Sequence, residues 1–305
     1  MRVLTVFYMN KKVVLRVFGG LGNQLFCYAA ARRLSIVNNA ELLIDSSSGF
    51  KYDSLYKRSY QLENFNILSN KAGKRYRFEP FSKIRRYILR RFNLLFSFSN
   101  RSFIQQESIG FDERLLSVKF NGVMYIEGYW QSEGYFKDIE EIIRKDLNIT
   151  PPLDRANQKL KRHIDKVQSV ALHVRYFDDP TAKDSFNNAS IDYYARAIKM
   201  MDDLHPNSHY FIFSDNPKQA LNVIPLSRDR VTCISHNTGD VNAYADLWLM
   251  SSCKHFITAN STFSWWGAWL SANSEKCIIT PNIAYKKGVS AWGFDGLIPD
   301  DWIKI

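Results

Sequence analysis

Short apolar runs alternate along the chain with longer segments whose apolar residues recur at helical spacing. In the N-terminal part, the pattern predicts strands at residues 12–18, 41–45 and 122–127 and helices at residues 25–37 and 136–147. A strand, a helix and a second strand in succession are typical of a β-α-β unit, so we expect a parallel sheet. Residues 50–115 have weak periodicity and predict helices mixed with irregular structure.

The second half of the chain repeats this alternation after a break. Two adjacent prolines in Asn148-Ile-Thr-Pro-Pro-Leu153 stop a helix and mark the best candidate linker. Beyond a helix that ends near His163, we expect strands at 169–174, 210–214, 231–234, 255–258 and 276–280, and helices at 191–204, 217–223, 241–252 and 264–271. This predicts a doubly wound parallel sheet and two α/β domains, residues 1–150 and 151–305. Two such domains favour a cleft enzyme, with a nucleotide on one and an acceptor on the other.

Polar side chains follow two of the predicted strands. His173-Val-Arg-Tyr-Phe-Asp178 comes after one apolar run, and Asn260-Ser-Thr-Phe-Ser-Trp-Trp266 comes after another and opens a predicted helix. Open α/β sheets bind ligands at the carboxyl ends of their strands. Arginine and the amides of a helix start both bind phosphate oxygens, and a carboxylate accepts from ribose hydroxyls or a guanine edge. A lone histidine is usually a core residue, but these neighbours favour a site for a nucleotide with a pyrophosphate.

A glycine-rich turn, Gly19-Gly-Leu-Gly-Asn-Gln24, separates the first predicted strand from the first predicted helix. It matches neither the dinucleotide fingerprint nor the Walker A loop, because Gln24 replaces the last glycine and no Gly-Lys-Ser/Thr follows. The glycines permit close backbone approach to a ligand, and Asn23 and Gln24 would add side-chain amides. A tight turn without a ligand is the alternative.

Two further features could be either structural or part of a site, and a third is a packing pattern. Ser214 and Asp215 end a predicted strand, where they form either a turn with a helix cap or a nucleotide contact. Asp246 lies among apolar residues of a predicted helix, facing either a ligand or solvent. The tryptophans at 265, 266 and 269 have the spacing of core residues. We expect no metal, because no cluster has metal-ligand spacing and no Asp-x-Asp pair occurs.

Composition indicates a folded protein with an uneven charge. The apolar fraction of 46% and the aromatic content of 14% are sufficient for real cores. The net charge is +11, and basic residues gather at Lys71, Lys74, Arg75, Arg77, Lys83, Arg85, Arg86, Arg90 and Arg91. This cluster indicates either attraction to an anionic surface, such as lipid headgroups or a pyrophosphate-linked acceptor, or merely a solvated helix face. Nucleic acid is a weaker option, because the signature of a common RNA-binding module is missing.

The cysteines and the N-terminus bear on the compartment. Cys27, Cys233, Cys253 and Cys277 form no C-x-x-C pair, so we expect reduced core residues in a reducing compartment. The apolar start of the chain is short and has no cleavage site, so no signal peptide is expected. No segment approaches the ~20 apolar residues of a membrane span. We therefore expect a cytoplasmic protein that can still touch a membrane surface.

Four segments, taken in order, resemble those of the bacterial α-1,2-fucosyltransferases. They are Gly19-Gly-Leu-Gly-Asn-Gln-Leu-Phe-Cys-Tyr-Ala29, Gly128-Tyr-Trp-Gln-Ser-Glu-Gly-Tyr-Phe136, His173-Val-Arg-x-x-Asp178 and Asn260-Ser-Thr-Phe-Ser-Trp-Trp266. The resemblance implies two Rossmann-like domains facing a cleft, as in the glycosyltransferase B-type fold. It implies GDP-fucose as donor, inversion, no required metal, and a galactose 2-hydroxyl as acceptor, commonly in a lipid-linked O-antigen unit. The acceptor-side domain would be residues 1–150, and the GDP-sugar-binding domain residues 151–305.

The resemblance also implies roles for individual residues. His173 and Asp246 would bind the guanosine part, and Arg175 would bind the β-phosphate and stabilise the leaving GDP. Ser261, Thr262 and Phe263 would hold the pyrophosphate, and Asn23 would lie at the reaction centre. The expected site is completed by Gly22, Ser214, Asp215 and Asn260 as donor-binding residues and by Asp178 as the candidate catalytic base. The departing phosphate is the other candidate for the proton acceptor.

One position departs from the family pattern. The usual motif is His-x-Arg-Arg-x-Asp, and Tyr176 stands in place of the second arginine. A neutral phenol cannot supply the missing charge, so either Arg175 suffices or another basic residue substitutes. Two alternatives stay open: a nucleotide- or glycan-binding protein without catalysis, and an enzyme that transfers another sugar from another nucleotide.

Overall fold

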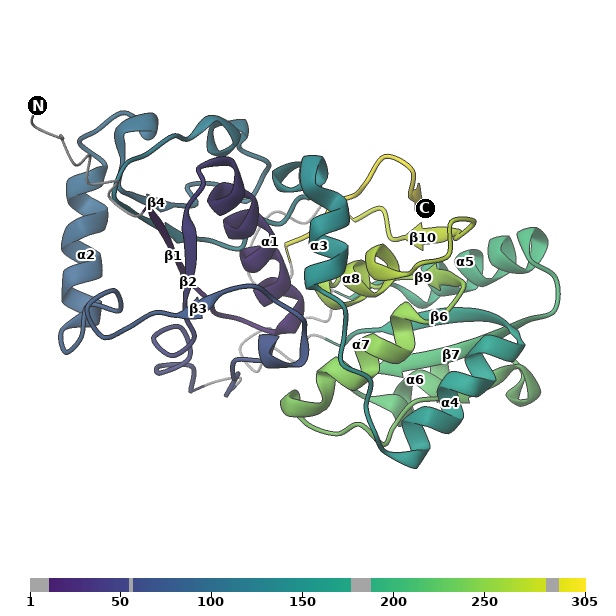
Figure 1. Cartoon of the computed structure of the whole chain (residues 1–305). Coiled ribbons are helices and arrows are strands. Elements are labelled where there is room, and N and C mark those ends of the chain that lie inside the picture. Colours follow the sequence, from purple (N-terminus) through teal and green to yellow (C-terminus); the bar gives the residue numbers. More distant parts are fainter. Residues whose placement is uncertain (1–10, 55–56, 177–187, 284–290) are drawn as a thin grey trace, which may run out of the picture. The chain divides into compact units, whose positions relative to one another are not determined.

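The computed structural model describes residues 11–54, 57–176, 188–283 and 291–305, and Figure 1 shows the chain. It divides into two compact units, of which the first ends at Asp146 and the second begins at Leu147. The sequence had placed the boundary near residue 150, at the paired prolines. Each unit is an α/β structure on its own parallel sheet, which confirms the predicted fold class.

Unit 1 has, within its described residues, a five-stranded parallel sheet in the order β3-β2-β1-β5-β4. Its strands are β1 (Lys12–Arg16), β2 (Glu41–Asp45), β3 (Asn70–Lys71), β4 (Phe103–Gln105) and β5 (Val123–Glu127), and its α-helices are α1 (Leu21–Val37), α2 (Ser82–Asn93) and α3 (Glu140–Asp146). In Figure 1 the strands lie between α1 and α2.

Helix α1 begins at Leu21, earlier than the predicted start at residue 25. The predicted turn is therefore limited to its first two glycines, and Gly22, Asn23 and Gln24 belong to the helix. The reason is tertiary: the buried Gln24 side chain donates to the Gly19 carbonyl at 2.9 Å and to the Ser59 carbonyl at 2.8 Å. These bonds fix the first turn of a helix whose sequence there favours a loop.

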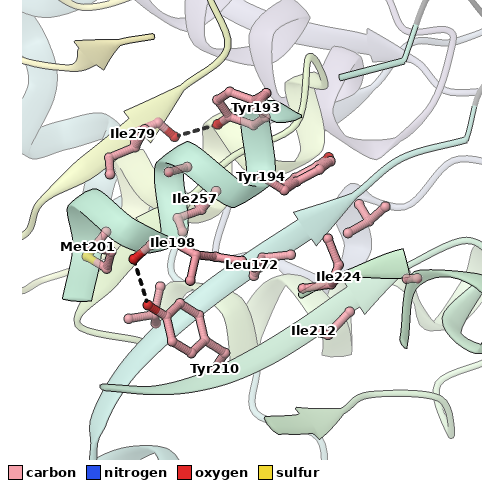
Figure 2. Close-up of a cluster of buried hydrophobic side chains, with 14 residues drawn as sticks. Leu172, Tyr193, Tyr194, Ile198, Met201, Tyr210, Ile212, Ile224, Ile257 and Ile279 are labelled. Atoms are coloured by element: carbon pink, nitrogen blue, oxygen red, sulfur yellow. Dashed lines mark hydrogen bonds between the residues drawn. The ribbon is translucent and has the colours of Figure 1, made fainter. Parts of the chain in front are cut away.

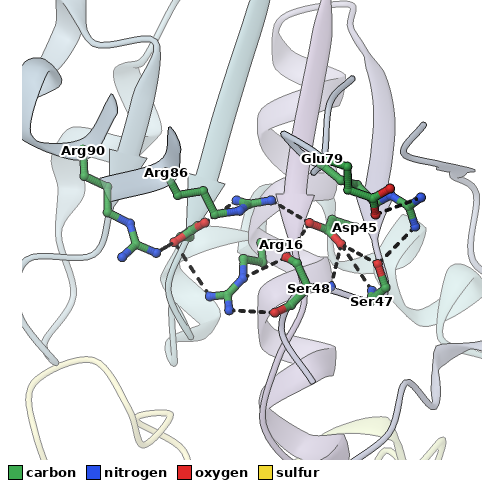
Figure 3. Close-up of polar contacts among 9 residues, drawn as sticks. Arg16, Asp45, Ser47, Ser48, Glu79, Arg86 and Arg90 are labelled. Atoms are coloured by element: carbon green, nitrogen blue, oxygen red, sulfur yellow. Dashed lines mark hydrogen bonds and ion pairs between the residues drawn. The ribbon is translucent and has the colours of Figure 1, made fainter. Parts of the chain in front are cut away.

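Alternate residues of the unit 1 strands share a face, because side chains in a strand alternate between the two sides of the sheet. Val14 and Leu43 pack with Ala72 in a small apolar cluster. Two residues further along the same face, at the carboxyl ends of β1, β2 and β5, lie Arg16, Asp45 and Glu127. Figure 3 shows that Arg86 and Arg90 of α2 join them in a network of ion pairs.

Unit 2 has, among the residues described, a six-stranded parallel sheet in the order β11-β10-β9-β6-β7-β8. Its strands are β6 (Gln168–Val174), β7 (Ser208–Ser214), β8 (Val231–Cys233), β9 (His255–Ile257), β10 (Ile278–Thr280) and β11 (Ile303–Lys304), and its α-helices are α4 (Arg155–Lys166), α5 (Ile191–Leu204), α6 (Pro217–Val223), α7 (Ala243–Ser251) and α8 (Thr262–Leu270). The sequence predicted each of these except β11.

The unit 2 core lies between α5 and the sheet. Figure 2 shows Leu172, Ile212 and Ile257 from the strands packed with Ile198 and Met201 from α5. Two tyrosines carry polar atoms into this core, and each finds an acceptor: Tyr193 donates to the Thr258 carbonyl at 2.7 Å, and Tyr210 donates to Asp202 at 2.7 Å. Burial of these large side chains contributes favourable free energy because their polar atoms stay hydrogen-bonded.

Helix α8 packs against α7, and its three tryptophans pack on one another. Trp265, Trp266 and Trp269 are buried, as their spacing predicted. A Cβ added at Gly267 would lie 2.3 Å from the Met250 sulfur, so the Met250 side chain would have to move to admit a larger residue there. All four cysteines are free. Within the described ranges, no helix is both long enough and apolar enough to cross a membrane.

Candidate functional site

The strand order of unit 2 reverses between β6 and β9. Starting from the central strand β6, the chain builds outward through β7 and β8, then returns to build β9, β10 and β11 on the other side. This is the doubly wound order of nucleotide-binding folds, in which ligands bind outside the carboxyl ends of the two strands at the switch point. Arg175 follows β6, and the turn that contains Ser261 follows β9, so both predicted motifs meet at this point.

His173 is buried at the carboxyl end of β6. Its ring lies 5.7 Å from the Phe263 ring, measured between centroids, which brings the histidine motif beside the start of α8. Burial, with a smaller effect of the Arg175 charge, lowers the pKa of His173 to about 3. The imidazole is therefore neutral at physiological pH. Its Nδ1 makes no hydrogen bond to any described residue, so a buried polar atom is available at the site.

Arg175 is held in place by Asp215. Its Nη1 donates to Asp215 Oδ2 at 2.8 Å, and the Tyr176 amide donates to Asp215 Oδ1 at 3.0 Å. One carboxylate thus fixes both the guanidinium and the backbone that carries it. Guanidinium groups offer five donors in a planar fork, so pairing with Asp215 orients the fork. The sequence had left Asp215 open between a turn and a ligand contact; its contact in the structure is with the key arginine.

Ser214 participates in the turn that follows β7. Its hydroxyl accepts from the Asn216 amide at 3.1 Å, and the Asn216 side chain caps α6 by accepting from Gln219. Pro217 occupies the first turn of that helix, where a missing N–H has no cost. These contacts match the turn-and-cap interpretation of this segment. A donor contact of Ser214 stays a prediction.

The turn after β9 presents the start of α8. Ser261 is the N-cap residue, and its hydroxyl accepts from the Phe263 amide at 3.3 Å. Ser261, Thr262 and Phe263 are partly exposed, whereas the preceding Asn260 is buried. The first turn of α8 contains no acidic residue. Amides at such a helix start attract anions, so this turn suits phosphate oxygens.

Asp246, on α7, is a carboxyl group with a perturbed pKa. It accepts from the Asn237 side chain at 2.8 Å, and Asn237 in turn bonds Asn157 of α4. Burial raises the pKa of Asp246 to about 7, although the bond from Asn237 acts in the opposite direction. A carboxyl group that is half ionised near neutral pH is typical of functional sites.

Tyr176 does not take the place of the missing arginine. It packs against the unit 2 core beside a small cavity of about 100 Å³, which Tyr194, Gln219 and Val223 also line. Its hydroxyl makes no hydrogen bond to a described residue. Burial and the nearby Asp215 raise its pKa, so the phenol stays neutral at this position. Asp178 lies outside the described residues.

In unit 1, the glycine turn brings together Asn23 and two residues from the segment after β5. Asn23 accepts from Gln131 at 2.8 Å, and the Tyr129 hydroxyl also hydrogen-bonds Asn23. These three residues also lie at a switch point. Asn23 follows β1, Tyr129 and Gln131 follow β5, and β1 and β5 are neighbours in the unit 1 sheet. Gly22 is buried in the first turn of α1, next to Asn23.

Sequence reasoning missed several of these contacts. It predicted that the Gln24 side-chain amide could contact a ligand, but that side chain is fully buried and donates to the Gly19 and Ser59 carbonyls. It gave no role to Tyr129 or Gln131, although both lie in one of the four segments of resemblance. Their position after a strand next to β1 was the signal that could have identified them. Across the described ranges, no group of three or more His, Cys, Asp or Glu side chains could hold a metal ion.

Comparisons with known proteins identify the family of the chain. The model of glycosyl transferase family 11 matches residues 95–294, more than half of the chain. An alpha-1,2-colitosyltransferase from Escherichia coli is 32% identical over 306 residues, which cover 96% of this chain and 98% of that protein. The O-antigen biosynthesis glycosyltransferase WbnK from Escherichia coli is 27% identical over 308 residues, with 94% and 98% covered.

Among solved structures, a mutant of FUT1 from Arabidopsis thaliana in complex with GDP matches with a TM-score of 0.54. The identity is 13%, and the match covers 94% of this chain and 73% of that one, so the likeness concerns the fold, which is of the glycosyltransferase B type. The family and the two relatives point to the same class of enzyme. The chain therefore belongs to glycosyl transferase family 11, and its activity is the transfer of a glycosyl group.

Proposed function

We propose that this protein is an inverting glycosyltransferase that moves L-fucose from GDP-fucose to the 2-hydroxyl of a galactose residue in an O-antigen-type glycan precursor. The observation that carries the proposal is the meeting of Arg175, oriented by Asp215, with the α8 start at the switch point of unit 2. A guanidinium and the amides at a helix start are two devices by which proteins bind a diphosphate without a metal.

Each part of a GDP-sugar has a suitable partner in unit 2. The Arg175 fork and the amides of residues 261–263 would bind the diphosphate. His173 is neutral and has a ring nitrogen with no partner among the described residues, so it can bond a nucleoside. Asp246, when ionised, would accept the two N–H donors that a guanine edge presents. Adenine and uracil lack that pair of donors, which supports a guanine nucleotide.

Transfer with inversion is a single displacement at the anomeric carbon of the sugar. The bond to the diphosphate breaks while the acceptor oxygen attacks from the opposite face, and negative charge develops on the departing phosphate. Preorganised charges and dipoles aimed at that phosphate lower the barrier. Arg175 and the α8 start would supply them, and Asp215 keeps the arginine from reorienting as the charge develops.

The acceptor hydroxyl must lose its proton during the displacement. Asp178 or the departing phosphate would accept it. In unit 1, Asn23 and its partners Tyr129 and Gln131 form a polar group that can orient a sugar hydroxyl. Burial raises the pKa of Tyr129 to about 12, so this phenol stays protonated and donates rather than acts as a base. We place the acceptor site at this group.

A second candidate donor follows from the comparisons. The Escherichia coli relative at 32% identity is an alpha-1,2-colitosyltransferase. Colitose is L-fucose without the 3-hydroxyl, so one site can accept either sugar unless a side chain requires that hydroxyl. GDP-fucose and GDP-colitose would differ only in that hydroxyl, so only the sugar pocket would distinguish them.

Calorimetric titration with GDP, UDP and ADP, in the presence of EDTA, tests the donor assignment first. We expect GDP to bind at least tenfold more tightly than the other two, and binding to survive EDTA. Equal binding of the three nucleotides, or none, would overturn the proposal and favour a different donor. Transfer assays with GDP-fucose and GDP-colitose on a galactose-terminated acceptor then decide between the sugars. A protein that binds GDP but neither hydrolyses nor transfers either sugar would be a binding protein.

A further inference from the structure

Helix α2 of unit 1 has its charged and apolar faces reversed. A surface helix usually turns its apolar stripe to the core and its charged residues to water. In α2 the residues that face the sheet are Arg86, buried, Arg90, half-buried, and Asn93, buried. Its large apolar residues Ile84 and Ile88 point away from the protein, and each is more than half exposed.

The inward face of α2 is fixed by polar contacts. Arg86 donates to Asp45 at 2.6 Å and also pairs with Glu127, which Arg90 contacts as well (Figure 3). The Asn93 side chain accepts from the Ser102 and Phe103 amides at 2.8 and 3.0 Å, which ties the end of the helix to β4. The helix is thus held in one orientation, and its apolar side is held outward.

The outward face is apolar along most of the helix. Ile84, Tyr87, Ile88 and Phe92 follow the spacing of residues that share one side of an α-helix, and each is at least 55% exposed. Phe81 before the helix and Leu95 after it extend the row, with exposures of 60% and 79%. We call Phe81, Ile84, Tyr87, Ile88, Phe92 and Leu95 the α2 apolar row. A helix of twelve residues is about 18 Å long. The row therefore forms an extended apolar patch, unlike the single exposed apolar residues that are common on protein surfaces.

Basic side chains border this row. Lys83 and Arg85 are exposed, and on a helix of 100° per residue they fall on opposite margins of the apolar row. Arg91 is exposed within the row itself: at 100° per residue it falls between Tyr87 and Ile84, and its guanidinium carbon lies 5.5 Å from the Tyr87 ring centroid. Long basic side chains can extend from such margins to contact phosphates while the apolar row enters a lipid layer.

We propose that α2 is an interfacial helix that docks unit 1 on an anionic membrane surface, with the α2 apolar row inserted at the level of the headgroups and Lys83, Arg85 and Arg91 contacting lipid phosphates. An apolar row with basic margins is the pattern of helices that lie in the plane of a bilayer. Charge complementarity selects an anionic membrane over a second copy of this chain, because this protein carries a net charge of +11 and its own α2 would repel its copy.

The charge pattern of the sequence is thereby divided. Within the basic cluster from Lys71 to Arg91, Arg86 and Arg90 serve the inside of unit 1, and Lys83, Arg85 and Arg91 serve the membrane. The inference is independent of the donor sugar. It adds to the proposed function only that the docked enzyme would meet a lipid-linked acceptor at the membrane surface.

Vesicle co-sedimentation, without donor or acceptor, tests the proposal. We expect the protein to bind vesicles of phosphatidylglycerol and phosphatidylethanolamine at least tenfold more tightly than vesicles of phosphatidylcholine. The double variant Ile84→Asn with Ile88→Asn should lose at least tenfold in binding, and Lys83→Gln with Arg85→Gln should lose binding mainly at low salt. Leu153→Asn, which removes an even more exposed aliphatic side chain in unit 2, is the control and should bind as the wild type does.

Three outcomes would overturn the docking proposal: no binding of the wild-type protein to anionic vesicles, unchanged binding of the Ile84/Ile88 variant, or an equal loss in the Leu153 variant. A concentration-dependent dimer that the Ile84/Ile88 substitutions abolish, without vesicle binding, would assign the row to a second copy instead. Transfer to a water-soluble acceptor, measured on the same variants, should stay at the wild-type rate. Absence of transfer in all proteins would contradict the proposed function and leave the vesicle result standing.

Discussion

The Arg175 guanidinium and the Asp215 carboxylate form an ion pair of 2.8 Å at the carboxyl ends of β6 and β7. The two residues come from neighbouring strands, in register at Val174 and Ser214, so the sheet itself sets their separation. Both side chains are about one quarter exposed. The pair is therefore accessible to a ligand, and its main effect is to hold the arginine in one orientation.

Replacement of Arg175 should impair turnover more than stability. We expect Arg175→Ala to lower kcat about 100-fold, equivalent to about 3 kcal/mol of lost transition-state stabilisation. Steady-state kinetics, with thermal unfolding measured alongside, check this. Arg228→Ala, which removes an exposed arginine of the same unit, should retain normal turnover. Near-normal turnover of the Arg175 variant would remove this residue from the mechanism.

Asp215 should act through Arg175. Asp215→Ala leaves the guanidinium present but without this anchor, so we expect a loss of about tenfold in kcat. Because the two residues form one unit, the double variant should be hardly slower than Arg175→Ala alone. A double-mutant cycle measures this coupling. Additive losses would mean that Asp215 contacts the substrate directly.

GDP binding should strengthen as pH rises through neutrality. The pKa of Asp246 is raised to about 7, so at pH 6 the group is mostly protonated and at pH 8 mostly ionised. Only the ionised form accepts both donors of a guanine edge, so we expect roughly tenfold tighter binding at pH 8 than at pH 6. Titrations of the wild type and of Asp246→Asn with GDP at both pH values check this. Ionisation of the GDP phosphate changes binding equally in both proteins, so the difference between them reports on Asp246. An equal pH dependence in the two would exclude Asp246 as the titrating group.

Arg86 should be essential for the stability of unit 1. Arg86→Ala leaves the carboxylates of Asp45 and Glu127 buried without this partner, which should cost about 3–5 kcal/mol of unfolding free energy. The neighbouring Arg85 is exposed, so Arg85→Ala should change stability by no more than about 0.5 kcal/mol. Urea denaturation of both variants provides the comparison. Similar stabilities would show that the network is dispensable.

The turn before α1 should require glycine at position 19. Its φ of 81° is left-handed, and an added Cβ would lie 3.0 Å from the Tyr129 ring. Gly19→Ala should therefore cost about 1–2 kcal/mol and disturb Asn23, with a loss of transfer activity. Gly73→Ala is the control, because an added Cβ there meets no atom within 4 Å. Denaturation midpoints and rates of both variants test the pair, and an undisturbed Gly19→Ala protein would contradict the strain argument.

The sequence predicted most of unit 2 because local signals and burial agree there. Helix α5 begins at the predicted residue because Ser190 caps it, and α6 does so because Asn216 caps it and Pro217 follows. The strands are continuous apolar runs, which parallel sheets buried on both faces require. The short β11 has no comparable signal, because two residues that pair with a neighbouring strand carry no periodicity of their own.

Unit 1 was harder to predict because two of its features depend on tertiary contacts. The first turn of α1 is stabilised by bonds of Gln24 to a distant loop, and nothing in the local sequence indicates them. The reversed faces of α2 become visible only once Asp45 and Glu127 are known to lie beneath it. The sequence alone does not show which face of a helix with apolar and basic residues is buried.

The sequence by itself determined the fold class, the strand ends that carry His173, Arg175 and Ser261, and the resemblance that led to the family, because these depend on local patterns and short motifs. Only the tertiary structure decided what each group contacts: that Asp215 orients Arg175, that Gln131 meets Asn23, and that Arg86 turns inward while Ile88 turns outward. The physical reason is that partners far apart in the chain are brought together by sheet register and packing, which no local pattern records.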